Sequence, residues 1–168
     1  MRRVLVIGSG GSGKSTLATK LGQKLDVPVI HLDKHYWRPN WQEPAKSEWL
    51  QIVDDLLSGD SWVMDGNYSG SLAQRIDRCD TIVFLDFSRL ICLWRVLKRR
   101  MLYRDRHRPD MAAGCPEQLN LEFVLWIWNY SRRSRPKVVK LIADNKDRKT
   151  IIWLKSPKEV NAFLQTVD

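Results

Sequence analysis

Short runs of β-branched and apolar residues alternate along the chain with longer segments in which apolar residues recur every three or four positions. The short runs predict buried strands at residues 3–7, 27–32, 61–64, 81–85 and 150–154. The longer segments predict helices with one apolar face at residues 14–25, 45–57, 88–101, 117–145 and from 156 onward. Because strands that alternate with helices form βαβ units, the pattern predicts a three-layer α/β/α fold with a five-stranded parallel sheet.

Turn and capping residues mark several boundaries of these elements. Ser156-Pro157-Lys158-Glu159 is a capping box with proline at the first helical position, and Ser88 can cap the helix that follows it. Pro136 predicts an interruption of the long helical region in which it lies. We expect irregular structure at residues 33–44, and also at 103–116, which are polar and broken by prolines and a glycine.

Composition places the chain among ordinary globular proteins. Its 168 residues suffice for a single domain over 1–168, and 43% hydrophobic with 28% charged residues is typical of such a domain. The apolar run near the N-terminus ends after four residues at Gly8, which is too short for an export or membrane segment. Cys79, Cys92 and Cys115 lack the spacing of a metal site, so we expect reduced thiols in a cytoplasmic protein with no membrane partner.

The net charge of +9 is concentrated in two segments. Residues 89–108 contain eight Lys or Arg and one acidic residue, and residues 131–140 contain five basic residues and no acid. The remainder of the chain has fifteen basic and eighteen acidic residues, a charge of −3. Such clusters favour a polyanionic partner, either the phosphates of a nucleotide or the backbone of a nucleic acid.

A glycine-rich loop lies between the first predicted strand and the first predicted helix. Its sequence has the form G-x-x-x-x-G-K-S, which in this context predicts a site for a nucleoside triphosphate. Backbone N–H groups of such a loop surround the phosphates, Lys14 supplies positive charge to the β- and γ-phosphates, and Ser15 offers a hydroxyl to Mg²⁺. We therefore expect ATP and Mg²⁺ to bind at Gly8, Ser9, Gly10, Gly11, Ser12, Gly13, Lys14, Ser15 and Thr16.

The Mg²⁺ ion also requires a carboxylate at the end of another strand, and two residues can supply it. Asp65 ends a predicted strand and precedes Gly66, which leaves room for a ligand at that point. Asp86 follows the strand of residues 81–85, but it lies two residues before a helix cap and can bond locally to that helix. We favour Asp65 and keep Asp86 as the alternative.

These motifs, in this order, resemble those of adenylate kinases and their relatives. The matching stretches are the glycine-rich loop, Asp65-Gly66-Asn67-Tyr68, and Phe84-Leu85-Asp86 followed by the basic segment 95–100. The nearer resemblance is to the bacterial family called DNA topology modulation proteins, which look like small P-loop relatives of adenylate kinase. Its signature stretches match residues 31–33, 65–70, 108–111 and 134–137, and the resemblance covers essentially the whole chain.

The resemblance implies a fold like that of nucleoside monophosphate kinases, with a lid at about residues 103–132. The residues that it assigns to the nucleotide are Arg95, Arg99, Arg132, Arg133, Arg135, Ser156 and Pro157. The first two match lid-helix arginines that contact the adenine and the phosphates, the next three lie where the lid returns, and the last two border the adenine. The chain differs from adenylate kinases at two places: Asn67-Tyr68 replaces a Pro-Arg pair of those kinases, and residues 33–44 do not resemble their AMP-binding region.

Asp33 follows the second predicted strand. A carboxylate at this position can orient or deprotonate an acceptor hydroxyl, or it can only form hydrogen bonds within a turn.

Our leading hypothesis is an ATP- and Mg²⁺-dependent phosphotransferase acting on a small molecule, with a nucleotide- or nucleoside-like acceptor favoured. Its expected catalytic residues are Lys14, Asp33, Arg99 and Arg132. The alternative is a DNA-associated P-loop NTPase that influences DNA topology. The sequence leaves open the acceptor, the choice between ATP and GTP, and the oligomeric state.

Overall fold

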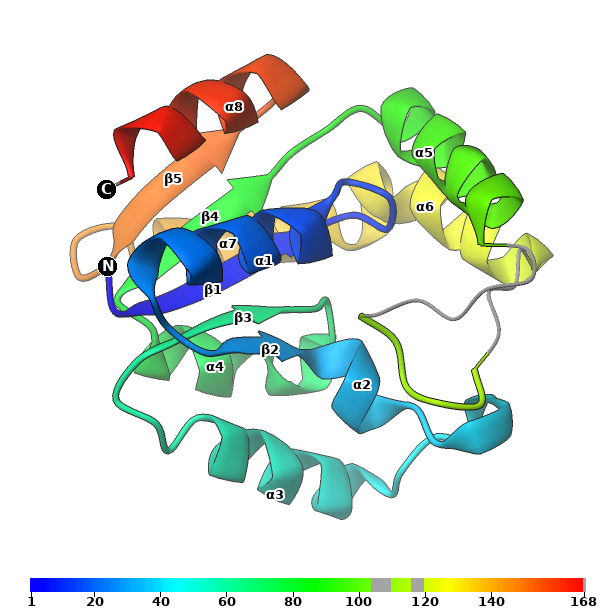
Figure 1. Cartoon of the computed structure of the whole chain (residues 1–168), viewed down its shortest axis with the longest axis horizontal. Coiled ribbons are helices and arrows are strands. Elements are labelled where there is room, and N and C mark those ends of the chain that lie inside the picture. The colour runs from blue at the N-terminus through cyan, green and yellow to red at the C-terminus, as the bar shows by residue number, and fades with distance from the viewer. Residues whose placement is uncertain (104–109, 116–119, 168) are drawn as a thin grey trace.

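The computed structural model describes residues 1–103, 110–115 and 120–167. Five strands form one sheet: β1 (Arg3–Gly8), β2 (Val29–His31), β3 (Trp62–Asp65), β4 (Thr81–Leu85) and β5 (Thr150–Leu154). All their pairings are parallel, and the strand order is β2-β3-β1-β4-β5 (Figure 1). The predicted five-stranded parallel sheet is confirmed, and β1 lies at its centre, so the loop that follows β1 emerges between the ends of β3 and β4.

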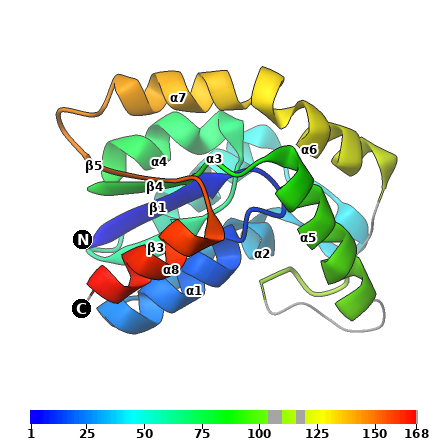
Figure 2. The same ribbon diagram turned by 90° about the horizontal axis from the view of Figure 1, so that it is seen from above.

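Helices cover both faces of the sheet, as the three-layer prediction requires. One face carries α1 (Lys14–Leu25) and α8 (Pro157–Thr166), and the other carries α3 (Lys46–Leu56), α4 (Leu72–Arg78) and α7 (Arg135–Ala143) (Figure 2). Beyond the carboxyl ends of the strands lie α5 (Arg89–Leu102) and α6 (Leu121–Arg133), while α2 (Leu32–Tyr36) continues β2. Two 3₁₀ turns, η1 (Pro39–Trp41) and η2 (Ser69–Ser71), complete the described elements. Among the described helices, none has the length and apolar character needed to cross a bilayer.

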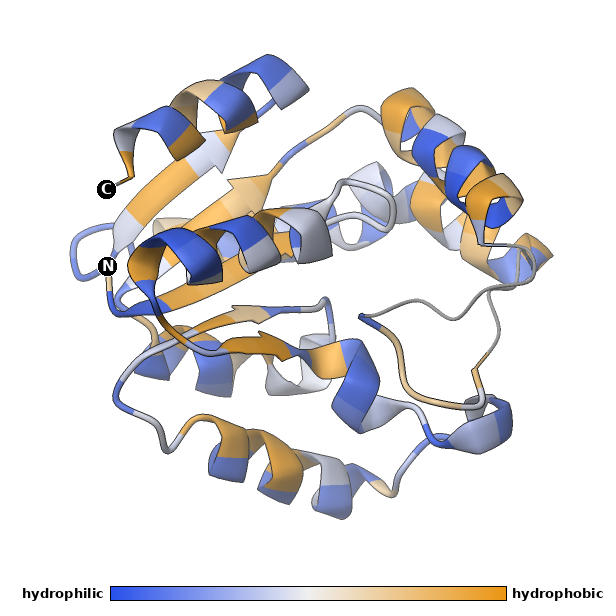
Figure 3. Ribbon diagram, viewed as in Figure 1, coloured by the Kyte–Doolittle hydropathy of each residue, from blue (hydrophilic) through white to orange (hydrophobic). Residues whose placement is uncertain are grey.

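Alternate side chains of β1 point to opposite faces of the sheet, which explains its uninterrupted apolar run. Val4 and Val6 belong to the core under α1 and α8, whereas Leu5 and Ile7 belong to the core under α3, α4 and α7. All four residues are at most 1% exposed, and burying a side chain of this size contributes about 1.5–3 kcal/mol. Figure 3 shows the hydrophobic character of the strands at the centre of the fold. The loop after β1 therefore starts from a fixed position.

Most element boundaries agree with the sequence pattern. The bounds of α1, β4 and β5 are those predicted, and Ser156 and Ser88 cap α8 and α5 by accepting hydrogen bonds from backbone N–H groups. The segment 33–44, expected to be irregular, contains most of α2 and all of η1, so Asp33 lies in the first turn of a helix. The region 117–145 divides into α6 and α7 at Ser134, because Pro136 lies in the first turn of α7. Parts of the predicted lid, residues 104–109 and 116–119, lie outside the described residues.

The carboxylate of Asp86, directly after β4, joins three elements. Arg135, at the start of α7, donates from Nε to Oδ1 at 2.8 Å and from Nη2 to Oδ2 at 2.7 Å. The indole N–H of Trp153, in β5, donates to Oδ2 at 3.0 Å. Burial alone would raise the pKa of Asp86, but these donors and the charge of Arg135 outweigh it and lower the pKa below its ordinary value. The start of α7 is therefore tied to the carboxyl edge of the sheet.

The middle of the glycine-rich loop packs directly on α5 and α6. A Cβ atom on Gly11 would lie 2.2 Å from the carbonyl oxygen of Cys92 in α5. A Cβ atom on Gly10 would lie 2.9 Å from the Phe123 ring and 3.1 Å from the Trp126 ring, both in α6. Gly11 also has a φ of +77°, a conformation that is strained for other residues. Close packing of α5 therefore requires glycine at position 11, whereas a side chain at position 10 would have to displace the two rings of α6.

We expect Asp86→Asn to lower the free energy of unfolding near neutral pH by about 1–2 kcal/mol, because Arg135 loses a charged partner that is only partly screened by solvent. The folded-state pKa of Asp86 is lowered, so its stabilisation is present above the unfolded-state value of about 3.8 and disappears as the pH falls through the folded-state value. Chemical denaturation of both proteins across this pH range measures the difference. A difference that is independent of pH would contradict the assignment.

Gly11→Ala should lower the free energy of unfolding by about 2 kcal/mol or more, because the methyl group meets a backbone oxygen at a strained φ. Gly70→Ala is the matched control, since a Cβ there meets nothing within 4 Å. We expect that variant to change the free energy of unfolding by less than about 1 kcal/mol. Denaturant unfolding of the two variants tests the packing, and equal effects would show that α5 does not constrain the loop.

Candidate functional site

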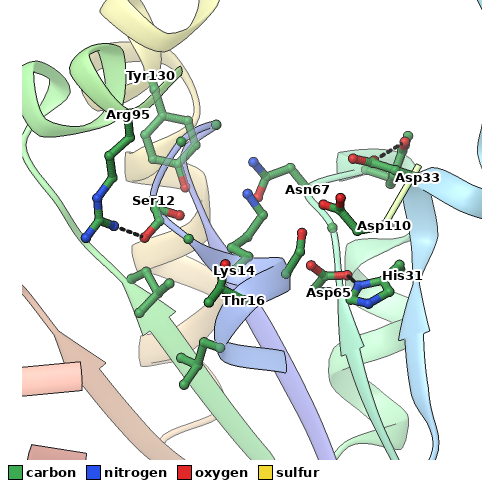
Figure 4. A pocket seen from close by; sticks show the side chains of 18 of the residues that line it. Ser12, Lys14, Thr16, His31, Asp33, Asp65, Asn67, Arg95, Asp110 and Tyr130 are labelled. Atoms are coloured by element: carbon green, nitrogen blue, oxygen red, sulfur yellow. Dashed lines mark hydrogen bonds and ion pairs between the residues drawn. The ribbon is translucent and has the colours of Figure 1, made fainter. Parts of the chain in front are cut away.

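A cavity of about 1640 Å³ opens at the carboxyl ends of the strands, which is where open parallel sheets bind ligands. Its walls come from the glycine-rich loop, α2, the segment after β3, and parts of α5, α6, α7 and α8. Figure 4 shows side chains from several of these elements around the loop. The sequence-predicted residues that line the cavity are Gly10, Gly11, Ser12, Gly13, Lys14, Ser15, Thr16, Asp33, Asp65, Arg95, Arg99, Arg133 and Pro157.

The carbonyl oxygen of Ser9 holds the glycine-rich loop in shape. It accepts hydrogen bonds from Ser12 Oγ at 2.8 Å and from Lys14 Nζ at 3.0 Å. The N–H of Gly8 donates to Oδ1 of Asn67 at 3.4 Å. Gly8 and Ser9 do not line the cavity themselves, but their hydrogen bonds hold the loop in place. Gly13, at the N-cap of α1, has no side chain that could cover the positive end of this helix. The loop therefore presents backbone N–H groups and an ammonium group together.

Lys14 lies between the loop and two carboxylates. Desolvation lowers the pKa of Lys14, and the negative charges of Asp65 and Asp33 oppose this shift without cancelling it. A phosphate group beside the ammonium would add negative charge and favour its protonated form. A bound anion would therefore offset the cost of keeping the buried ammonium group of Lys14 charged.

On the α8 side of the loop, Arg95 and Pro157 contribute to the cavity as the resemblance implies. Arg95 donates from Nη1 to the carbonyl oxygen of Ser12 at 2.9 Å, and its guanidinium lies 5.2 Å from the centre of the Phe87 ring. Arg99, one turn later in α5, lines the same cavity. Arg95 therefore supports the loop itself, while both arginines lie where they can contact a nucleotide.

Asp65, at the end of β3, is 3% exposed and bonded to a histidine. Its Oδ1 lies 2.9 Å from Nδ1 of His31, and the other ring nitrogen lies 3.5 Å from Oγ1 of Thr19. Burial lowers the pKa of His31, but the hydrogen bond and the charges of Asp65 and Asp110 outweigh it and raise the pKa above its ordinary value. His31 thus fixes the orientation of the Asp65 carboxylate, a role that the sequence did not indicate.

The donor set around the loop suits Mg²⁺ bound together with phosphate. The described residues contain no group of three or more His, Cys, Asp or Glu that could hold a metal ion by themselves. Ser15 and Asp65 both line the cavity, and a hydroxyl, a carboxylate and phosphate oxygens are the hard donors that Mg²⁺ prefers. The carboxylate of Asp86 is engaged by Arg135 and Trp153, so Asp65 stays our candidate.

Asp33 and Tyr68 form the wall of the cavity opposite the glycine-rich loop. The Tyr68 hydroxyl donates to Oδ1 of Asp33 at 2.6 Å. Burial raises the pKa of Tyr68, and the charge of Asp33 adds to the effect, so the hydroxyl stays protonated and acts as the donor. The Tyr68 ring packs against Tyr36 and Trp49, with centroids 4.3 and 5.0 Å away. Aromatic packing therefore holds the hydroxyl that orients Asp33.

A buried arginine that the sequence pattern did not reveal holds the segment after β3. Arg75 is fully buried in α4 and donates to the carbonyl oxygens of Gly66, Tyr68 and Ser71 at 3.0, 2.7 and 3.3 Å. Burial lowers the pKa of Arg75 to about 10, which leaves it charged at neutral pH. It occupies the inner face of α4 between Leu72 and Ile76, and this interruption of the apolar period explains why α4 was not predicted.

The basic residues where the chain passes from α6 to α7 take three different positions. Arg133 lines the cavity, together with Lys137 from α7. Arg135 bonds to Asp86 and is therefore part of the scaffold. Arg132 is exposed, and its neighbour Arg133 lines the cavity instead. The catalytic role of Arg132 therefore stays a prediction, and Arg133 is better placed to contact phosphate.

The comparisons with known proteins place the fold. No model of a protein family matches the chain, and no curated protein does. Among solved structures, a shikimate kinase from Bacteroides thetaiotaomicron matches with 15% identity and a TM-score of 0.52, over 98% of this chain and 94% of its own. A putative kinase from Chloroflexus aurantiacus matches with 17% identity and a TM-score of 0.51, over 98% and 96%.

A third match is the shikimate kinase from Acinetobacter baumannii in complex with shikimate, with 13% identity and a TM-score of 0.66, over 99% of this chain and 90% of its own. Identities this low bear on the fold alone. The resemblance to DNA topology modulation proteins stays an expectation from the sequence. The chain has the α/β fold of shikimate kinase-like P-loop proteins, with a five-stranded parallel sheet and a cavity at its carboxyl edge.

Proposed function

We propose that this protein is an ATP- and Mg²⁺-dependent phosphotransferase that acts on a hydroxyl group of a small molecule. The observation that carries the proposal is one cavity with the glycine-rich loop and Lys14 on one side and Asp33, oriented by Tyr68, on the other. Phosphoryl transfer requires a protein to supply positioning and positive charge rather than covalent help. The kinase folds of the structural neighbours support this class of reaction.

The loop side of the cavity would hold the nucleotide. Backbone N–H groups of residues 8–15 and the positive end of α1 attract the phosphates, and Lys14 adds a charge beside the β- and γ-phosphates. Ser15 and, directly or through water, Asp65 would hold Mg²⁺, which neutralises charge on phosphate oxygens when it is bound. Arg95 and Arg99 close this side of the cavity from α5.

The opposite side would hold the acceptor. In the transfer step an acceptor hydroxyl attacks the γ-phosphorus, the bond to the β-phosphate oxygen breaks, ADP leaves, and the hydroxyl proton passes to a base. Asp33 is our candidate for this base, and the bond from Tyr68 fixes the orientation of its carboxylate. Tyr36, Trp37 and Trp41 line the cavity nearby, and such aromatic walls suit an acceptor with a flat ring, such as a nucleoside.

Positive charge for the transferred group would come from two directions. Arg99 reaches the cavity from α5, whereas Arg133 and Lys137 reach it from α6 and α7. Cations on both sides of the phosphoryl group stabilise the charge that spreads over its oxygens in the transition state. An arginine that closes on this group is worth on the order of 10³–10⁵ in rate.

Release of ADP from Mg·ATP tests the proposal directly. We expect slow release without an acceptor, a rise toward about 1–100 turnovers per second with the right one, and loss of both in Lys14→Ala. The panel should contain nucleosides, nucleoside monophosphates, sugars, shikimate and duplex DNA. Stimulation by one small molecule would identify the acceptor, whereas stimulation by DNA alone would favour the DNA-associated NTPase over the kinase.

The role of Asp33 can be separated from nucleotide binding. With the acceptor identified by the panel, we expect Asp33→Asn to lower the turnover number by about 10²–10⁴, and Tyr68→Phe to lower it less. Affinity for Mg·ATP should change little in either variant, because both residues lie on the acceptor side of the cavity. Steady-state kinetics and calorimetric titration measure the two quantities. A turnover number that survives in Asp33→Asn would remove the base from the proposal.

A further inference from the structure

The hydroxyl group of Tyr130 is a buried polar group in the cavity that has no role in the transfer step described above. Tyr130 lies near the end of α6, is 6% exposed and lines the cavity. Its Oη atom has no hydrogen-bond partner among the residues that the structure describes. Buried hydroxyl groups in folded proteins are almost always paired, because an unpaired one destabilises the fold. The group therefore requires an explanation, and a bound ligand is one.

The position of this hydroxyl is fixed by a row of aromatic side chains on α6. Tyr130 packs edge to face on Trp126, with ring centroids 5.6 Å apart, and Trp126 lies nearly parallel to Phe123 at 5.9 Å. Trp126 and Phe123 are the two rings that a Cβ on Gly10 would meet. Figure 4 shows the Tyr130 ring directed from α6 toward the glycine-rich loop, and Tyr130 and Ser12 both line the cavity. The hydroxyl is therefore held beside the place where phosphates are expected.

The surroundings keep this hydroxyl protonated, so it can serve as a donor. Burial raises the pKa of Tyr130, and the nearby Asp86 and Cys92 raise it further, whereas Arg135 acts in the opposite direction. The oxygens of Asp86 already accept three hydrogen bonds, two from Arg135 and one from Trp153. An anion that enters the cavity would therefore meet a phenol O–H that is not committed to this neighbouring carboxylate.

We propose that Tyr130 binds the nucleotide, its hydroxyl donating a hydrogen bond to a phosphate oxygen of the triphosphate held by residues 8–15. The proposal rests on the nucleotide site of the proposed function, but it depends neither on the acceptor nor on the transfer step. The phenol is already removed from water in the free protein, so its bond to a charged oxygen adds to affinity without a further cost of desolvating the phenol. Sequence motifs do not indicate this residue, because it lies far from the loop along the chain.

Tyr130→Phe removes this hydroxyl and leaves the ring in place. We expect the variant to unfold thermally at the same temperature as the wild type or higher, because no hydrogen bond within the free protein is lost. Its dissociation constant for Mg·ATP should rise about 10-fold, and that for adenosine should not change, because adenosine has no phosphate. Isothermal titration with ATP, ADP and adenosine measures these effects. A loss confined to ATP assigns the bond to the γ-phosphate, and a loss shared with ADP assigns it to the α- or β-phosphate.

Trp128→Phe is the matched control, since Trp128 lies in the same helix but is 42% exposed and stacks under Arg89 outside the cavity. That variant should bind Mg·ATP as the wild type does. The proposal is overturned if Tyr130→Phe binds Mg·ATP within about twofold of the wild type, a change of less than about 0.4 kcal/mol. It is also overturned if adenosine binding weakens equally. A wild-type protein that fails to bind Mg·ATP at all would instead refute the nucleotide site of the proposed function.

Discussion

The packing of α5 and α6 directly on the backbone of the glycine-rich loop is the constraint on which the rest of the site depends. Gly11 approaches the carbonyl oxygen of Cys92 so closely that no side chain fits between them, and Arg95 of the same helix bonds to the carbonyl oxygen of Ser12. The contact between Gly11 and Cys92 joins main-chain atoms on both sides, which cannot rotate away as side chains do. A shift of the loop must therefore move α5 with it, and the predicted lid begins directly after α5 and ends within α6.

The parts of the site that follow from local sequence were predictable, and the parts created by tertiary contacts were not. The glycine-rich loop is one continuous motif between a strand and a helix, so its position followed from the order of elements. The pairing of His31 with Asp65 brings together residues from two strands, and nothing in either segment specifies it. Adjacent residues of a helix point about 100° apart, so a run of arginines gave no indication that Arg133 rather than Arg132 lines the cavity.

Some basic residues of the chain stabilise the fold, whereas others line the cavity. Of the basic residues between 131 and 140, Arg135 is engaged with Asp86, whereas Arg133 and Lys137 line the cavity. Arg95 and Arg99 reach the same cavity from α5. Cations that converge on one cavity suit a compact polyanion such as a triphosphate, whereas a nucleic-acid backbone is more commonly met by cations along an open surface. The arrangement therefore favours the small-molecule kinase over the DNA-associated alternative.

The hydrogen bonds of Arg75 and Asp86 contrast with the unsatisfied hydroxyl of Tyr130. Arg75 donates to three carbonyl oxygens and Asp86 accepts three hydrogen bonds, so each stabilises the fold whether or not a ligand is present. Tyr130 is also buried, with 6% of its surface exposed, yet its hydroxyl is unsatisfied by the described residues. An unsatisfied group of this kind destabilises the free protein and is relieved when a ligand supplies the missing partner. It therefore contributes to the difference in free energy between the free and bound states, which is the quantity that determines affinity.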